Sequence, residues 1–252
     1  MINKTTGCAL FSLLMIIVST SVANATDRTW TGAGTDARWQ NSANWGGTAP
    51  VAGDVLRFSG ATNLSPTNDF PADTSFSGVT FLSGASPYNL TGNRVTLGGN
   101  IVNQSSATQT LGLPLLINSS ADRTFDTPNG SILFSGSLNY NVGTTPRYYR
   151  KSGSNELVIT GTTLVTNLYS RFALDEGTLR FTPGSRFYLV DTSTERTIIR
   201  IGDVANKSSA MIVESGADVA IGGLILQANA VVGGTSTFDL MVNGNLLFTG
   251  ND

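Results

Sequence analysis

The residues of this chain that could do chemistry are few, and most of them are carboxylates. Asp175 and Glu176 are adjacent, so in a strand they would point to opposite faces. The pairs that could supply the acid and base of a glycoside hydrolase are Asp122 with Asp126, Asp175 with Glu176, and Asp191 with Glu195. All of these carboxylates lie near Gly, Ser, Thr or Pro, which indicates turns more than a catalytic centre.

Other catalytic classes have less support. Polysaccharide lyases combine calcium, held by an Asp cluster, with an Arg or Lys base. Asp203 near Arg200, or Asp122 near Arg123, could imitate that arrangement, but no Asp-rich cluster at ligand spacing exists. Nucleophile triads and the usual zinc sites need His or Cys. The chain has no His and a single Cys in its first segment, so we expect no enzyme activity, no metal site and no cofactor.

One basic and aromatic patch stands out, at residues 146–151. It carries the candidate glycan contacts Tyr148, Tyr149, Arg147 and Arg150. Two tyrosines flanked by cations could stack on sugar rings or hold an acidic glycan. The simpler interpretation is a solvated loop whose tyrosines partly cover a coil of the fold.

Trp30, Trp39 and Trp45 are the only tryptophans, and all lie near the start of the chain. In an exposed row they would form a sugar-binding platform, whereas buried they would close the end of a stacked fold. We favour the structural cap, because an uncapped end exposes unpaired backbone and apolar core. The following Gly53 and Asp54 predict a turn and not a calcium ligand.

The first segment, residues 1–25, reads as a secretory signal peptide. Lys4 supplies the positive start, residues 8–18 are apolar apart from Ser12, and residues 23–25 (Ala-Asn-Ala) form a cleavage site that leaves Thr26 first. No later segment approaches the length of a membrane-spanning helix. The net charge of -2 disfavours nucleic acid as a partner. We therefore expect a secreted or cell-surface protein.

Beyond the tryptophans the chain reads as short β-type runs between Gly, Asn, Asp and Ser, with almost no helix. Gly followed by an apolar run recurs at Gly78, Gly99, Gly130, Gly177, Gly223 and Gly244. Four of the five spacings fit one or two periods of roughly 21 to 24 residues. The 31-residue step would need an inserted loop within residues 104–129. The period predicts an all-β fold, a right-handed parallel β-helix (β-solenoid) with a Trp-rich N-terminal cap.

The sequence resembles the autotransporter-associated β-strand repeat proteins, which are secreted or surface proteins of Gram-negative bacteria. Their repeat reads approximately Gly-Leu-x-Leu-x-Gly, a loop, then apolar-x-x-Gly-Thr-Leu-x-apolar. Residues 156–161 (ELVITG) and 172–181 (FALDEGTLRF) follow that order, and residues 211–222 match the looser Ser-Gly-Ala-x-Val turns. The opening, with Trp30, Trp39, Trp45, Pro50 and Phe58, is similar to the segment that precedes such repeats.

The resemblance implies a structural passenger or stalk at the cell surface or outer membrane, with a role in adhesion. We divide the chain into a signal peptide (1–25), a cap segment (26–58) and a β-solenoid domain (59–252), and expect further repeats or an anchor region to follow. Cell-surface or extracellular glycans are the expected partners. The alternative is a carbohydrate-binding or polysaccharide-lyase-type β-helix protein.

Overall fold

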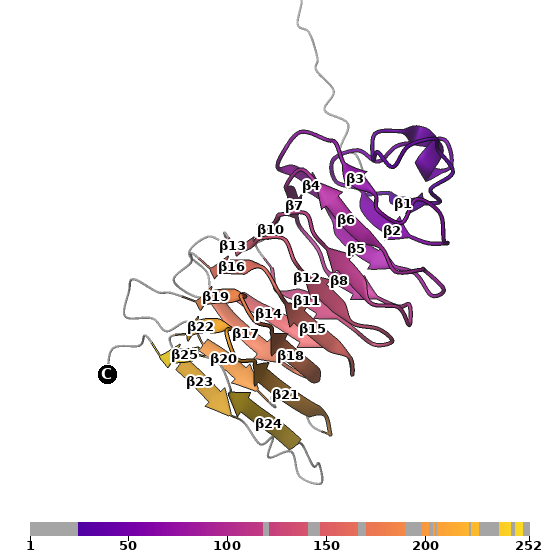
Figure 1. Ribbon diagram of the computed structural model, residues 1–252. Coiled ribbons are helices and arrows are strands. Elements are labelled where there is room, and N and C mark those ends of the chain that lie inside the picture. The colour runs from indigo at the N-terminus through magenta and orange to yellow at the C-terminus, as the bar shows by residue number, and fades with distance from the viewer. Residues whose placement is uncertain are drawn as a thin grey trace, which may run out of the picture.

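The computed structural model shows an elongated stack of short strands (Figure 1). It describes residues 25–117, 121–140, 147–165, 170–189, 198–201, 204, 206–221, 223–226, 237–242 and 245–248. The signal peptide predicted for residues 1–25 lies outside these residues except for Ala25. Within the described ranges the one helix is a 3₁₀ turn, η1 (Ser42–Trp45). No helix there is long and apolar enough to span a bilayer.

Three parallel sheets make up the described stack. Sheet I has nine strands: β1 (Asp27–Trp30), β2 (Val55–Phe58), β5 (Gly78–Phe81), β8 (Ile101–Asn103), β11 (Arg123–Asp126), β14 (Arg147–Ser152), β17 (Ser170–Leu174), β20 (Ile198–Ile201) and β23 (Gly223–Leu226). Sheet II has eight: β3 (Thr67–Asn68), β6 (Asn89–Gly92), β9 (Gln109–Leu111), β12 (Ile132–Phe134), β15 (Glu156–Ile159), β18 (Gly177–Phe181), β21 (Ser208–Val213) and β24 (Thr237–Val242). Sheet III has eight: β4 (Thr74–Phe76), β7 (Val95–Leu97), β10 (Leu115–Ile117), β13 (Leu138–Tyr140), β16 (Thr162–Val165), β19 (Arg186–Leu189), β22 (Asp218–Ile221) and β25 (Asn245–Phe248).

Two strands that are neighbours in a sheet are separated by one turn of the chain. From β2 onward the chain visits sheets I, II and III in rotation, and beyond β1 each strand pairs with the strand three places later. The strand pairs of the described stack are parallel, for example Leu56 with Val79 and Val79 with Ile101. A chain that returns to the same sheet after each turn is a solenoid. The predicted parallel β-solenoid is therefore confirmed.

The length of one turn varies more than the sequence period suggested. Val95 pairs with Leu115 and Leu179 with Met211, so the second of these turns is more than half as long again as the first. The predicted inserted loop between Gly99 and Gly130 is wrong. Gly99 precedes a strand of sheet I, whereas Gly130 precedes a strand of sheet II. The 31 residues between the two glycines therefore cover one full turn of the solenoid and about a third of the next turn, without an inserted loop.

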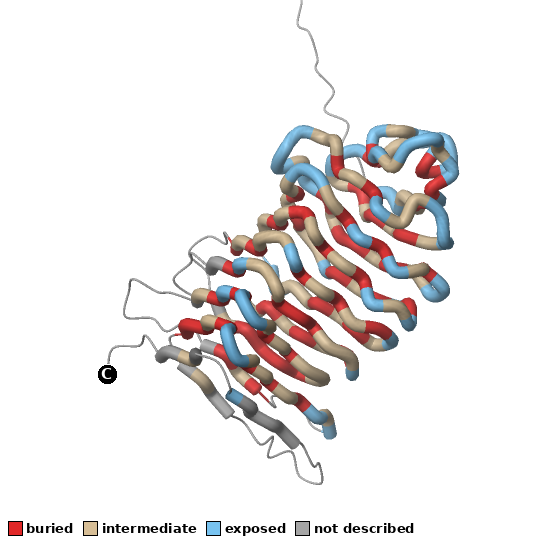
Figure 2. Tube along the Cα trace, viewed as in Figure 1, coloured by how far each residue is buried: buried red, intermediate tan, exposed pale blue. Residues whose placement is uncertain are grey.

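The core is a set of side-chain columns that run through the stack. Along each strand, inward residues are buried and their neighbours are partly exposed, an alternation that recurs from coil to coil in Figure 2. Burying a column of apolar side chains supplies the main stabilisation of such a stack. One column on sheet I contains Leu56, Val79, Ile101, Phe125, Leu174 and Ile201, all buried.

The N-terminal end of this core is closed by the tryptophans, whose exposed fractions are 0% (Trp30), 1% (Trp39) and 5% (Trp45). Trp45 meets both other indoles edge to face, with ring centroids 5.1 Å from Trp30 and 6.3 Å from Trp39. It also lies 5.8 Å from the ring of Phe58, the first aromatic side chain of β2. The predicted burial of all three rings is confirmed.

Residues 26–54 of the cap segment also cover the backbone of the first regular coil, which begins at β2. On sheet I, β1 pairs with β2. On sheet II, Trp39 N donates to Thr67 O at 3.1 Å, and beside sheet III Gly53 N donates to Ser75 O at 2.8 Å. The segment therefore acts as an irregular first coil, which pairs with all three strand edges that would otherwise be open.

Candidate functional site

The basic and aromatic patch belongs to β14, an interior strand of sheet I between β11 and β17. The solvated loop expected for residues 146–151 is therefore wrong for the described residues 147–151. Tyr149 and Lys151 point into the core, while Tyr148 and Arg150 are partly exposed on the outer face. A lysine at an inward position hides the apolar alternation that would have identified this strand.

Tyr149 does not reach the surface. Its side chain is 1% exposed, and its ring lies 4.0 Å from the buried ring of Tyr140. Of the four predicted glycan contacts, Tyr148, Arg150 and Arg147 remain partly exposed. Tyr149 instead supports the strand from inside.

Tyr148 lies at the centre of an arginine cluster formed by Arg150, Arg171 and Arg200. Their guanidinium carbons lie 5.0, 5.6 and 6.0 Å from the centroid of its ring. The Tyr148 hydroxyl accepts hydrogen bonds from Arg171 at 2.9 Å and from Arg200 at 3.1 Å. Cations this close to a ring face are attracted by its quadrupole. We call these four residues the Tyr148 cluster.

The register of sheet I brings these residues together from three coils. Arg171 pairs directly with Tyr148, whereas Arg150 and Arg200 both pair with Ala173, one on either side. Ala173, which lies between these two arginines in the register, is small and fully buried. Arg171 follows Tyr148 by one turn of the chain, so the coil period is the one signal in the sequence that could have found it.

The arginines of the cluster act on the Tyr148 hydroxyl and on the neighbouring carboxylate of Asp175. The hydrogen bond from Arg171, outweighing burial, lowers the pKa of Tyr148 below its usual value, with further help from Arg200. Arg150 donates to both carboxylate oxygens of Asp175, each at 3.0 Å. This outer patch therefore combines a ring face with guanidinium groups, the donors that suit carboxylates and sulfates.

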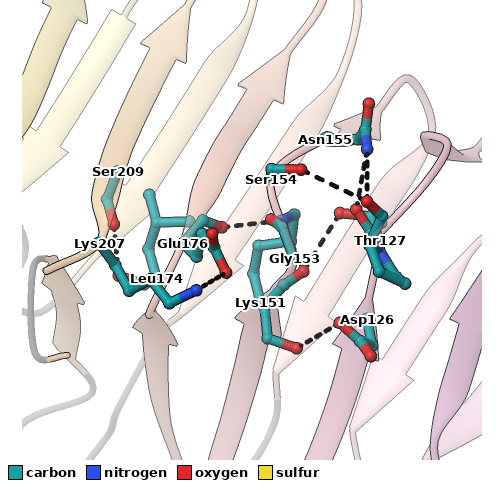
Figure 3. A network of polar contacts seen from close by, with 12 residues as sticks. Asp126, Thr127, Lys151, Gly153, Ser154, Asn155, Leu174, Glu176, Lys207 and Ser209 are labelled. Carbon is teal, nitrogen blue, oxygen red and sulfur yellow. Dashed lines mark hydrogen bonds and ion pairs between the residues drawn. The ribbon is translucent and has the colours of Figure 1, made fainter. Parts of the chain in front are cut away.

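Lys151 occupies a core position, between Phe125 and Leu174 in the buried column of sheet I. Its side chain is 0% exposed. The ammonium group donates to three backbone carbonyls at a corner of the coil, those of Ser152 (2.8 Å), Gly153 (2.7 Å) and Glu176 (2.8 Å). Figure 3 shows Lys151 between Gly153 and Glu176.

Burial lowers the pKa of Lys151 to about 8, although the charges of Asp126 and Glu176 oppose the shift. The ammonium is therefore still the main form at pH 7, and its three protons match three acceptors. A Cβ on Gly177 would lie 2.9 Å from this nitrogen, so the Gly-Thr-Leu motif leaves room for the lysine. Gly153 O and Glu176 O thereby gain a donor at this corner, while Ser152 O also accepts from Thr127 N at 3.0 Å.

The carboxylates considered as catalytic groups have structural partners. Asp122 accepts from Tyr148 N at 3.0 Å, and Asp126 from Ser152 Oγ at 2.8 Å. Asp175 pairs with Arg150 in the Tyr148 cluster, and Glu176 with Lys207 at 3.0 Å (Figure 3). Asp191, Glu195 and Asp203 lie outside the described residues.

The described residues contain no group of three or more His, Cys, Asp or Glu side chains that could hold a metal ion. Gly53 has φ +93° and precedes the buried Asp54, which agrees with the predicted turn.

No family model, no curated protein and no solved structure matches the chain.

Proposed function

We propose that the chain is the structural passenger or stalk of an exported, surface-located protein of a Gram-negative bacterium. The observation that carries this proposal is the continuous parallel ladder, in which three sheets share one core behind a closed N-terminal end. Each coil of such a stack contacts mainly its neighbours, so coils can be added without changing the fold. A stack of this kind suits a rigid spacer that presents corner loops to a partner.

The position at the cell surface is supported by the leader and by the resemblance to autotransporter-associated β-strand repeat proteins. Lys4, the apolar stretch and the Ala-Asn-Ala site form a complete export signal. The role proposed is mechanical and adhesive, without catalysis or a cofactor. A further repeat or anchor region is the proposed partner at the C-terminal side.

The test is export and display from a Gram-negative host that expresses the full chain with its own leader. We expect the leader to be removed and, with the region encoded after Asp252 included, the chain to be reached by antibody and external protease on intact cells. The control replaces Lys4 and the apolar stretch with polar residues. An unprocessed chain that stays in the cytoplasm would refute the proposal.

A second candidate function, binding of an acidic glycan, is favoured by the Tyr148 cluster. Sugar rings stack on aromatic faces, and the guanidinium groups of Arg171 and Arg200 present donors to acidic substituents beside the same ring. The cluster spans β14, β17 and β20, so it extends along the stack. A polymeric ligand could follow that direction.

Retention on immobilised polysaccharides tests this function. We expect the protein to be retarded on polygalacturonate or heparin more than on neutral dextran, and Tyr148→Ala and Arg171→Ala to lose that retention. The matched control is Tyr188→Ala on sheet III, because Tyr188 donates its hydroxyl proton to Asp218 at 2.6 Å and has no arginine stacked on it in the described contacts. Equal retention of wild type and Tyr148→Ala would eliminate the glycan site.

A further inference from the structure

The start of the described chain lies against a buried carboxylate. The backbone nitrogen of Thr26 donates to Oδ1 of Asp54 at 3.1 Å. Oδ2 of the same group accepts from Arg28 Nε at 3.0 Å and from Val51 N at 2.9 Å. The Asp54 side chain is only 3% exposed. Asp54 is thus a built acceptor with three donors, one of them on Thr26.

The surroundings keep Asp54 ionised. Burial alone would raise its pKa, but hydrogen bonds from Val51, Arg28 and Thr26 outweigh burial and lower it. The other charges on β1 and β2 belong to Asp27 and Arg57, which pair with each other at 2.5 Å. Arg28 and Thr26 therefore both donate hydrogen bonds to the ionised carboxylate of Asp54.

Thr26 is also the residue that leader removal would place first. Hydrolysis of the Ala25–Thr26 amide bond consumes one water, leaves a carboxylate on Ala25 and gives Thr26 an amino group that binds a proton. Ala25 and Thr26 are both exposed, next to the Ala-Asn-Ala site. The nitrogen that becomes the new amino group is the nitrogen that already faces Asp54.

We propose that Asp54 is the binding site for the α-ammonium group of the processed chain, and that leader removal thereby locks β1 onto the end of the solenoid. The inference rests on the export proposed above. In the precursor Thr26 offers one neutral N–H, whereas the processed chain offers a charged donor, and charge-assisted hydrogen bonds are about twice as strong as neutral ones. Thr26 O accepts from Val55 N at 2.9 Å, so both the nitrogen and the carbonyl of Thr26 form hydrogen bonds that fix the start of the edge strand β1.

The pKa of the α-amino group measures the pairing directly. Two proteins with defined N-termini are compared, one that begins at Thr26 and one that begins at Ala25, where the amino group is displaced by one residue. We expect the Thr26 protein to titrate at least one unit above the usual range of about 7.7 to 8.0, and the Ala25 protein to titrate within it. Asp54→Asn in the Thr26 protein is expected to abolish the shift.

The melting temperature of the Thr26 protein should depend on pH through the titration of the same α-amino group. A raised pKa means that the folded Thr26 protein holds its proton where the unfolded chain has lost it. Its advantage in melting temperature over the Ala25 protein is therefore full at pH 6 and lost as the pH rises through the folded pKa. Because both proteins keep Asp54, this comparison remains decisive if Asp54→Asn does not fold.

The outcomes separate this inference from the export proposal. A secreted chain shown by mass spectrometry to begin at Thr26, with the raised pKa, supports both. A secreted chain that begins elsewhere, or equal pKa values in the Thr26 and Ala25 proteins, overturns the lock and leaves export standing. A chain that is never processed refutes the export proposal, while the titration of the two defined proteins still tests the pairing.

Discussion

Trp45 shows how one side chain can hold the end of a stack. It packs against both other indoles and Phe58, and its indole N–H donates to Trp39 O at 2.7 Å. Replacing a buried tryptophan with alanine removes a large apolar area and leaves a cavity. We expect Trp45→Ala to lower the free energy of unfolding by about 3 to 5 kcal/mol, measured by denaturant titration.

The matched control is Val51→Ala, which lies in the same segment but is 52% exposed. It should change the free energy of unfolding by less than about 0.5 kcal/mol. If Trp45→Ala left stability intact and reduced only glycan retention, the tryptophans would be a binding platform and the cap interpretation would be wrong.

Lys151 is a second residue-scale feature, and its buried amine should make stability depend on pH. Its pKa falls from 10.5 to about 8 on folding, so between these values the unfolded state binds more protons than the folded state. Stability therefore rises with pH across that window. Compared with Lys151→Met, wild type should gain about 2 kcal/mol between pH 8 and pH 10.

Denaturant titrations at pH 7, 8, 9 and 10 check this prediction, because all other titrating groups are common to the two proteins. The difference between them should change only slightly from pH 7 to pH 8 and most steeply between pH 8 and pH 10. Parallel curves from pH 7 to pH 10 would mean that Lys151 does not lose its proton in the folded state in this range.

At the scale of strands and corners, coil spacing depends on glycines that meet the backbone of the preceding coil. A Cβ on Gly99, just before β8, would lie 1.6 Å from Ser77 O, whereas a Cβ on the adjacent Gly98 would have its nearest neighbour, Phe76 O, at 3.7 Å. Gly99→Ala must therefore push two coils apart. We expect it to destabilise the fold by about 3 kcal/mol or more.

Gly98→Ala serves as the control, since the two substitutions are chemically identical and one residue apart. It should be neutral or stabilising by up to about 1 kcal/mol, because alanine reduces the freedom of the unfolded chain. Thermal unfolding of the two variants measures the contrast. Equal effects would show that the corner can relax and that close coil contact is not what requires Gly99.

At the scale of the whole molecule, the cap segment separates the first regular coil from solvent. Deleting residues 26–53 would uncover Phe58 and leave the edges of β2, β3 and β4 unpaired. Open parallel edges beside an apolar core favour pairing with another copy. We expect the shortened chain to associate as its concentration rises, at concentrations where the intact chain does not.

Light scattering over a concentration series, with circular dichroism to follow β content, tests this expectation. A shortened chain that stays monomeric and melts at the temperature of the intact chain would show that the first coil needs no cover. Val51→Ala in the intact chain should leave the association state unchanged, because this residue is largely exposed.

The features that the sequence determined by itself are those set by local chemistry. β-branched and apolar runs between Gly and Asn predicted the short strands, and runs such as 55–58 and 132–134 coincide with β2 and β12. The tryptophans were expected to be buried, since rings of that size rarely stay in water at the end of a core. Gly99 and Gly177 marked corners where the backbone of two coils approaches closely.

Only the tertiary structure decided which residues meet across coils, because that depends on turn lengths that differ from one coil to the next. Arg200 pairs with Ala173 over a turn longer than the predicted period, so only the folded stack shows that it lies beside Tyr148. Lys151 looked like part of a basic surface patch, yet three carbonyls at a corner make its inward position favourable. Such contacts join residues far apart in the chain, and no local pattern records them.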